Sequence, residues 1–203
     1  MKARLFVVNE ESRLNVISTN EVSVIVTEST YQSGEKKGKK RNNWNQTITD
    51  IVDDLLQISI GDYIFLWESG SKNIYGVYRA VSKPFYRRDE GRNDIFKIKI
   101  KIAYDFEKPI NEYDIINNPY MKNRLWNIIG KKVAGKSRAT TPITNEEMQF
   151  LIQSLIANNP NYKFYEASDE ISVENELSFD FINQYDTAIP DSISDYIYEP
   201  FEY

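Results

Sequence analysis

Residues 95–102 alternate between large apolar side chains and lysines, and this pattern limits the folds that the chain can adopt. The apolar set is Phe96, Ile98, Ile100 and Ile102, and the basic set is Lys97, Lys99 and Lys101. Successive side chains of a β-strand point to opposite faces, so the pattern predicts a strand with one buried face and one face in water. The fold must therefore contain a sheet that covers a core.

Four other segments have the composition of strands. They are Ala3–Asn9, Glu21–Thr27, Tyr63–Trp67 and Ile74–Val81. Each is rich in apolar or β-branched residues and is bounded by polar or turn-forming ones. Residues 69–73 have the sequence of a hairpin turn and join the last two strands. Two polar loops, over residues 29–43 and 82–94, complete this part of the chain.

Two segments have helical periodicity. In Thr47–Leu56 the apolar residues recur at the spacing of one buried face. In the second helix, Thr144 to Asn158, Thr144 and Glu147 form a capping box, and Asn159-Pro160 ends the helix. Residues 123–129 suggest a further helical turn. The sequence predicts an α+β fold: a mixed, barrel-like sheet of about six strands with two principal flanking helices.

The chain contains no cysteine and no histidine. Disulfides, thiolate nucleophiles and Cys-ligated zinc are therefore impossible, and the commonest general base and metal ligand is missing. A hydrolytic site would need paired carboxylates, for which Asp53-Asp54 and Asp89-Glu90 are candidates. Neighbours in sequence rarely converge, so solvated charge explains these pairs better. We expect no enzyme, no cofactor and no bound metal.

The charges are segregated along the chain. Residues 1–164 hold all 25 Lys and Arg residues and 19 acidic ones, whereas residues 165–203 hold 11 acidic residues and no basic one. This division predicts a basic domain over 1–164 and an acidic, aromatic tail or linker over 165–203. No apolar run approaches the ~20 residues of a membrane span, and the start lacks the features of a signal peptide. We expect a cytoplasmic protein.

Trp44 lies among polar residues immediately before the first predicted helix. Its ring could stack on a nucleobase, or it could be a half-buried anchor between loop and helix. Phe85 and Tyr86 lie in the aromatic, basic loop between two strands. They could complete a clamp around a flat ligand. Alternatively, Phe85 could plug the end of the barrel and leave Tyr86 exposed.

Basic residues gather in three places that could contact phosphates. The clearest is Lys136-Ser137-Arg138, where an arginine stands beside small, open residues. Lys40-Arg41 and Arg87-Arg88 add further positive charge. Each run alone is also typical of a solvated basic turn.

The order of these elements resembles that of EVE and YTH domains of the PUA-like superfamily. The order is strand, loop ending in tryptophan, helix, Gly-Asp before an apolar strand, Ser-Gly turn, Tyr-Gly-Val strand, aromatic loop, alternating strand, Ser-Arg segment and capped helix. The most similar stretch runs from Gly61 through Trp67 to Val77, and the resemblance covers roughly residues 2–160. It implies a PUA-like fold that holds a modified nucleobase in an aromatic cage.

The resemblance also implies roles for particular residues. Trp44 matches a cage tryptophan, and Phe85 or Tyr86 falls where the second cage wall stands, with Trp67 as a further pocket residue. Asn9 and Glu10 match positions at the base edge, and Arg138 matches an arginine that contacts the nucleic-acid backbone. Where YTH domains often place an acidic residue after that arginine, this chain has Ala139.

Function follows as a hypothesis. Relatives of this kind recognise modified DNA in restriction proteins, so the resemblance implies a module that specifies methylated DNA for a defence system. The tail would connect it to a nuclease or AAA+ motor effector. An RNA-binding PUA-like module, a carboxylate enzyme and a protein-interaction domain with an aromatic tail remain alternatives.

Overall fold

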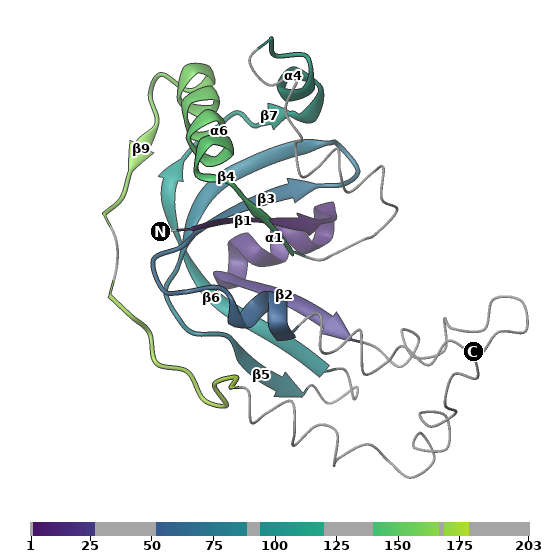
Figure 1. Ribbon diagram of the computed structural model, residues 1–203, viewed down its shortest axis with the longest axis vertical. Helices are drawn as coiled ribbons and strands as arrows, with labels where there is room; N and C mark the ends of the chain where they lie inside the picture. Colours follow the sequence, from purple (N-terminus) through teal and green to yellow (C-terminus); the bar gives the residue numbers. More distant parts are fainter. Residues whose placement is uncertain (1, 27–51, 89–93, 120–139, 167–168, 179–203) are drawn as a thin grey trace, which may run out of the picture.

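Strand β6 (Asp94–Asp105) organises the sheet, because two groups of strands pair with its two halves. The computed structural model describes residues 2–26, 52–88, 94–119, 140–166 and 169–178. The first half of β6 pairs with β2 (Glu21–Val26) and β5 (Phe85–Arg88), and the second half pairs with β4 (Asn73–Ala80). The sheet bends along this strand into a half-barrel (Figure 1).

The remaining strands extend the sheet beyond β4. The main path follows the order β2-β6-β4-β3-β1-β8. The pair of β1 (Ala3–Val8) and β3 (Tyr63–Glu68) is parallel, and the other pairs are antiparallel, so the sheet is mixed. Strand β8 comprises Thr140–Ile143, and the short strands β7 (Ile110–Asn111) and β9 (Lys163–Phe164) pair with β4 and β6.

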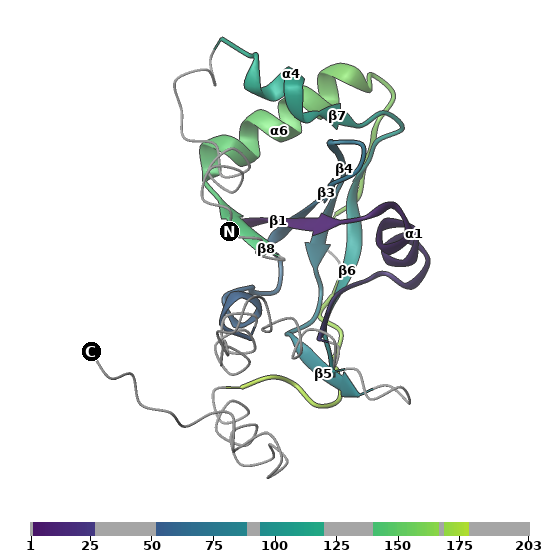
Figure 2. The same ribbon diagram turned by 90° about the vertical axis from the view of Figure 1, so that its right-hand side faces the viewer.

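Helices cover both faces of this sheet. Figure 2 shows α1 (Glu10–Thr19) on one side of the central strands and α6 (Asn145–Asn158) on the other. The short helix α4 (Glu112–Ile116) lies near α6, and residues 52–56 form a further helical turn. The predicted α+β class, with a mixed sheet and flanking helices, is confirmed.

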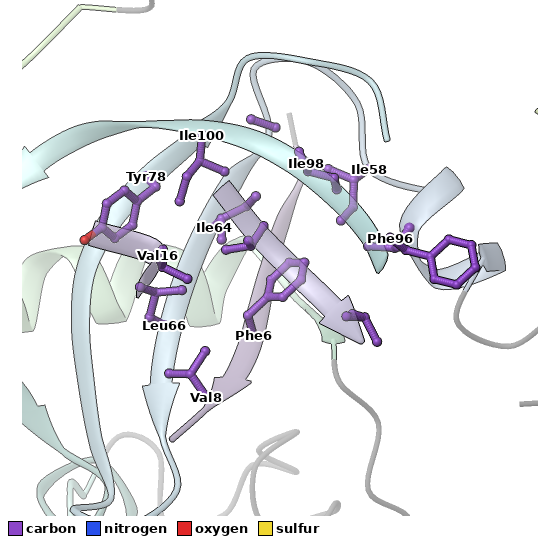
Figure 3. Packing of buried hydrophobic residues seen from close by; sticks show 14 of the residues in the cluster. Phe6, Val8, Val16, Ile58, Ile64, Leu66, Tyr78, Phe96, Ile98 and Ile100 are labelled. Carbon is purple, nitrogen blue, oxygen red and sulfur yellow. The ribbon is translucent and has the colours of Figure 1, made fainter. Parts of the chain in front are cut away.

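Alternation along the strands gives the molecule two hydrophobic cores. Ile64 and Leu66 of β3 point into the inner core, whereas Tyr63, Phe65 and Trp67 point into the outer core on the opposite face. The inner core also contains Phe6, Val16, Val22, Val52, Leu55, Tyr78, Phe96, Ile98 and Ile100 (Figure 3). The outer core is closed by Leu151 and Leu155 of α6.

The predicted capping box of the second helix is confirmed. The Glu147 backbone N–H donates to Thr144 Oγ1 at 3.1 Å, and the Thr144 backbone N–H donates to Glu147 Oε2 at 2.7 Å. The first predicted helix is described from residue 52 onward, so its predicted start at Thr47 lies outside the described residues. The predicted turn over 123–129 also lies outside them.

Three parts of the structure differ from the prediction. Helix α1 is not among the predicted elements, because just one of its side chains, Val16, is buried and no apolar stripe marks it. The predicted loop over 82–94 contains β5, which is held by pairing with β6. Strand β8 was also missed, since its four residues have no run of apolar side chains.

The described part of the predicted tail packs against the domain. The Leu177 N–H donates to Pro84 O at 2.8 Å, and the Tyr86 N–H donates to Asn175 O at 3.0 Å. The Leu177 side chain is 3% exposed and belongs to the inner core. Residues 169–178 therefore contribute a core side chain and cover the edge of β5. Within the described residues, no helix has the length and apolar character needed to cross a membrane.

Candidate nucleic-acid interface

Tyr86 of β5 and the helical turn over residues 52–56 meet in the inner core. The half-buried Tyr86 ring lies 5.7 Å from the Phe96 ring, at an angle of 49° between the planes. Val52 and Leu55 are buried in the same cluster, and Figure 3 shows Phe96 and Ile58 at this end of the half-barrel. The turn that follows Trp44 in sequence therefore packs at the end where Tyr86 lies.

A buried arginine joins that helical turn to two strands. Arg4 of β1 is 4% exposed; its Nη1 donates to Thr140 Oγ1 at 2.8 Å, and its Nη2 donates to Gln57 Oε1 at 2.7 Å. Asp54 Oδ1 lies 3.8 Å from Arg4 Nη1. A guanidinium inside a protein needs such partners, since an unpaired buried charge is strongly unfavourable. The Arg4 cluster therefore fixes β1, β8 and residues 54–57 relative to one another.

The predicted site did not include the cluster of Arg4, Asp54, Gln57 and Thr140, although one feature of the sequence points to it. Arg4 is the single charged residue within the apolar run Ala3–Val8. A charge in a strand that is otherwise buried needs partners, so the sequence predicts a carboxylate or a polar group from another element beside Arg4. Its partners could not be identified from sequence, because Thr140 is 136 residues away.

Six predicted site residues lie outside the described residues. They are Lys40, Arg41, Trp44, Lys136, Ser137 and Arg138. The structure describes the elements that follow them, namely the helical turn from residue 52 and strand β8 from Thr140. Both elements are bound by the Arg4 cluster. The roles of these six residues stay predictions.

Asn9 and Glu10 open helix α1. The Asn9 side-chain oxygen caps the helix by accepting from the Ser12 N–H at 2.7 Å, and Glu10 lies in the first turn. Both side chains are exposed. Part of the hydrogen-bonding capacity of Asn9 is thus used by the cap, while Glu10 is open to solvent.

Phe85 lies inside the molecule, where it presents no open ring face. It is 3% exposed, and its backbone forms a bridge with Glu176 of the covering segment. This position corrects the prediction of Phe85 as an exposed cage wall. It also differs from the alternative in which Phe85 plugs the barrel, because Tyr86 packs against the inner core and Phe85 therefore points to the opposite face of β5. Tyr86, the next residue, is half-buried and is the ring of this pair that reaches solvent.

The basic residues of β5 are near this aromatic pair. The exposed Arg87 guanidinium carbon lies 5.9 Å from the centroid of the Phe85 ring. The backbone of Arg88 belongs to β5, but its side chain lies outside the described residues. Lys83 pairs with Glu176 at 2.8 Å. An acidic segment therefore lies beside this basic region.

Trp67 lies on the wrong face of the sheet for the predicted pocket. Its side chain is 7% exposed and packs in the outer core, whereas Tyr86 and residues 52–55 belong to the inner core. Alternation along β3 causes this separation, because Leu66 points inward and Trp67 must point outward. The prediction of Trp67 as a pocket residue is corrected on this ground.

A shallow pocket of about 240 Å³ lies between α4 and α6. Its lining includes Asp114, Phe150 and Ser154. None of the predicted base-contacting residues lines it. This pocket therefore offers no support for the predicted site.

No group of three or more acidic side chains in the described segments could hold a metal ion. Of the candidate pair Asp53-Asp54, the buried Asp54 faces the Arg4 guanidinium. Its charge is thus engaged in the Arg4 cluster. The other candidate pair, Asp89-Glu90, lies outside the described residues.

Comparison with known proteins yields one family match. A model of the EVE domain matches residues 24–154. This range runs from the middle of β2 through β8 and covers most of α6. No curated protein matches the chain.

Solved structures with a similar course of the chain share little sequence with it. A protein from Leishmania major has 7% identity and a TM-score of 0.48, covering 77% of this chain and 96% of its own. Human THYN1, solved with DNA containing 5-methylcytosine, has 12% identity and a TM-score of 0.43, with coverage of 76% and 97%. The YTH domain of Zygosaccharomyces rouxii MRB1, solved with N6-methyladenosine RNA, has 15% identity and a TM-score of 0.38, with coverage of 75% and 86%.

Proposed function

Because the chain belongs to the EVE domain family, we propose that it binds nucleic acid and recognises a modified base, in DNA, without catalysing a reaction. The observation that carries the proposal is the packing of Tyr86 and of the turn that follows Trp44 in one core at one end of the half-barrel. We infer from this packing that Trp44 and Tyr86 lie in the same region of the domain.

In the proposed pocket, Trp44 and Tyr86 hold the base between their rings. A base in a duplex must leave the stack before its faces can be inspected, at a cost of a few kcal/mol. Stacking on an aromatic side chain returns about 1–3 kcal/mol per base. A buried methyl group adds about 0.8 kcal/mol, which favours the modified base over the unmodified one.

Asn9 and Glu10 are proposed to contact the edge of the base. Their exposed side chains stand where β1 ends and α1 begins. Glu10 can accept a hydrogen bond from an amino group, and the Asn9 amide can donate one. Phe85 is buried and contributes no ring face of its own.

Phosphate contacts are assigned to Lys136, Ser137 and Arg138, with Lys40, Arg41, Arg87 and Arg88 around them. A single residue separates Arg138 from Thr140, so the two α-carbons are within about 8 Å. The Arg4 cluster holds Thr140 beside the turn over residues 54–57. An arginine tethered there can bind a phosphate next to the extruded base.

We place this domain in a modification-dependent restriction or defence system, as the module that selects the target. Residues beyond 178 would then connect it to an effector, such as a nuclease or an AAA+ motor. Their sequence is acidic and aromatic, which suits a linker or a partner-binding segment.

Fluorescence anisotropy of the full chain tests the proposal. The probes are matched duplexes that are unmodified or carry 5-methylcytosine or N6-methyladenine, together with RNA carrying N6-methyladenosine. The proposal expects at least one methylated DNA to bind about tenfold more tightly than its unmodified counterpart, and Trp44→Ala to abolish that difference. Tyr113→Ala, which removes an exposed ring on α4, is the matched control and should leave it unchanged.

Equal affinity for every methylated and unmodified probe would overturn the reader model. Preference for methylated RNA over DNA of the same sequence would instead support the RNA-binding alternative, since the 2′-hydroxyl distinguishes the two.

A further inference from the structure

Four aromatic side chains form a continuous patch on the surface where β9 meets β6. We call Tyr104, Phe106, Tyr162 and Phe164 the aromatic patch. Tyr162 is 38% exposed and Phe164 is 51% exposed. Large rings exposed side by side lose the benefit of burial, so such a patch commonly marks a surface that binds something.

The rings contact one another in a defined arrangement. Tyr104 and Phe106 are nearly parallel, with 4° between their planes and 5.7 Å between their centroids. Tyr162 lies 5.8 Å from Phe106 and 6.0 Å from Tyr104, and Phe164 lies 4.8 Å from Tyr104. Pairing of Tyr104 with Phe164 across the two strands fixes this geometry. The patch is therefore held by the sheet backbone.

Positive charge continues from the patch along the same face of the sheet. Tyr63, Arg79 and Lys101 are neighbours across β3, β4 and β6, and directly opposed residues point to one face. The Arg79 guanidinium lies 4.4 Å from the centroid of the Tyr63 ring, and its Nη2 donates to the Tyr63 hydroxyl at 2.6 Å. Lys101 is exposed.

Tyr104 links the rings to these cations. Burial raises the pKa of Tyr104, and the neighbouring Tyr63, to which it is hydrogen-bonded, adds to the rise. Asp105 follows Tyr104 in β6 and points to the opposite face of the sheet, because side chains alternate along a strand. On that face, burial raises the pKa of Tyr78 in the inner core, and the charge of Asp105 adds to the rise. The patch and the cations thus form one face, with Asp105 turned away from it.

We propose that the aromatic patch and its flanking cations form a second nucleic-acid site, which takes unpaired nucleotides. Bases stack on the exposed rings, and phosphates bind Arg79 and the exposed Lys101. Exposed rings with cations beside them suit a strand with flat bases and a charged backbone better than an uncharged apolar partner. The site needs no modified base and stands apart from the proposed pocket, because β9 lies near the α6 end of the molecule and β5 at the other end (Figure 1).

Anisotropy with unmodified single strands tests this site separately from the reader function. The probes are labelled oligothymidine and oligouridine of about 15 nucleotides, which cover a site of the usual length. The variant Tyr162→Ala/Phe164→Ala should bind either probe about tenfold or more weakly than the wild type. Tyr113→Ala removes another exposed ring, on α4, and should bind as the wild type does.

Three outcomes would overturn the second site. They are no binding of either probe by the wild type, unchanged affinity of the double variant, and a monomer–dimer equilibrium by sedimentation that the double variant abolishes while nucleotide binding persists. The last result would assign the patch to a second copy of the chain. Thermal unfolding of both variants checks that the fold is retained, as the substituted rings are exposed. Weaker binding by the double variant would confirm the aromatic part of the site. Weaker binding by a separate Lys101→Ala variant, with a smaller dependence of its affinity on salt concentration, would confirm the cationic part.

Discussion

Arg4 of β1 donates a hydrogen bond to Thr140 of β8 over 2.8 Å, and so adds a side-chain link between the two neighbouring strands at one end of the main sheet path. The same guanidinium reaches Gln57 and faces Asp54, which follow the segment that contains Trp44. One buried side chain thus joins two described elements, the turn over residues 54–57 and strand β8, which follow in sequence the residues proposed for stacking and phosphate contacts.

Replacing Arg4 by methionine should lower the free energy of unfolding by about 3 kcal/mol. The substitution keeps much of the volume but leaves the buried Asp54 without its cation, and losing one partner of a buried pair costs about 3–5 kcal/mol. Arg4→Lys should recover little, because an ammonium cannot reproduce the fork that spans Thr140 and Gln57. Urea unfolding measures both variants. The exposed Lys101→Met is the control, and a loss for Arg4→Met no larger than that of this control would contradict the role of the cluster.

Leu177→Ala should destabilise the domain by about 2–3 kcal/mol, since it removes a buried side chain from the inner core. A chain ending at residue 164 should lose more, because it also exposes the backbone edge that Asn175 and Leu177 cover. A chain ending at residue 178 is the matched comparison. Similar urea midpoints for the two truncated chains would show that residues 165–178 contribute nothing to stability.

Strands and helices with clear periodicity could be predicted from the sequence. The lysine-lined strand and the capped second helix are both observed, because local alternation and the Thr144–Glu147 capping box act within a few residues. Helix α1 has no apolar stripe, but its cap was visible: Asn9 is followed by two acidic residues, and Asn20 ends the helix in the left-handed conformation. Capping residues thus mark the two ends of α1, where apolar periodicity is absent.

The candidate site depended on long-range pairing, which local sequence does not encode. Its sequence context predicts Phe85 as an exposed aromatic residue in a loop. In the structure, β6 and residues 175–177 pair with its strand on both sides. Trp67 is predicted as a pocket residue, but the alternation of side chains along β3 directs it into the outer core. The Arg4 cluster combines residues 4, 54, 57 and 140, and no spacing in the sequence relates them. The EVE family assignment succeeded because it rests on the order of many elements.

Acid should weaken the junction between α1 and β3 through Glu68. Hydrogen bonds from Ser71 and then Arg13 lower the pKa of Glu68 below its usual value, although burial opposes this. A carboxyl with a lowered folded pKa stabilises the fold fully above its unfolded pKa, and this contribution is lost as the pH falls through the folded pKa. Melting temperatures between about pH 6 and pH 3 should therefore fall less steeply for Glu68→Gln than for the wild type. Parallel curves for the two proteins would exclude this contribution.

Tyr86 should contribute to binding through its flat face. Tyr86→Phe keeps the ring and should retain the preference for a methylated base, whereas Tyr86→Leu keeps apolar volume beside Phe96 but loses stacking worth about 1–3 kcal/mol. The expected loss for Tyr86→Leu is therefore about tenfold in affinity for the methylated duplex, with little change for the unmodified one. Anisotropy gives the affinities, and thermal unfolding shows whether the leucine fills the space. If Tyr86→Leu folds normally and still distinguishes methylated from unmodified DNA, the second wall of the pocket must come from another residue.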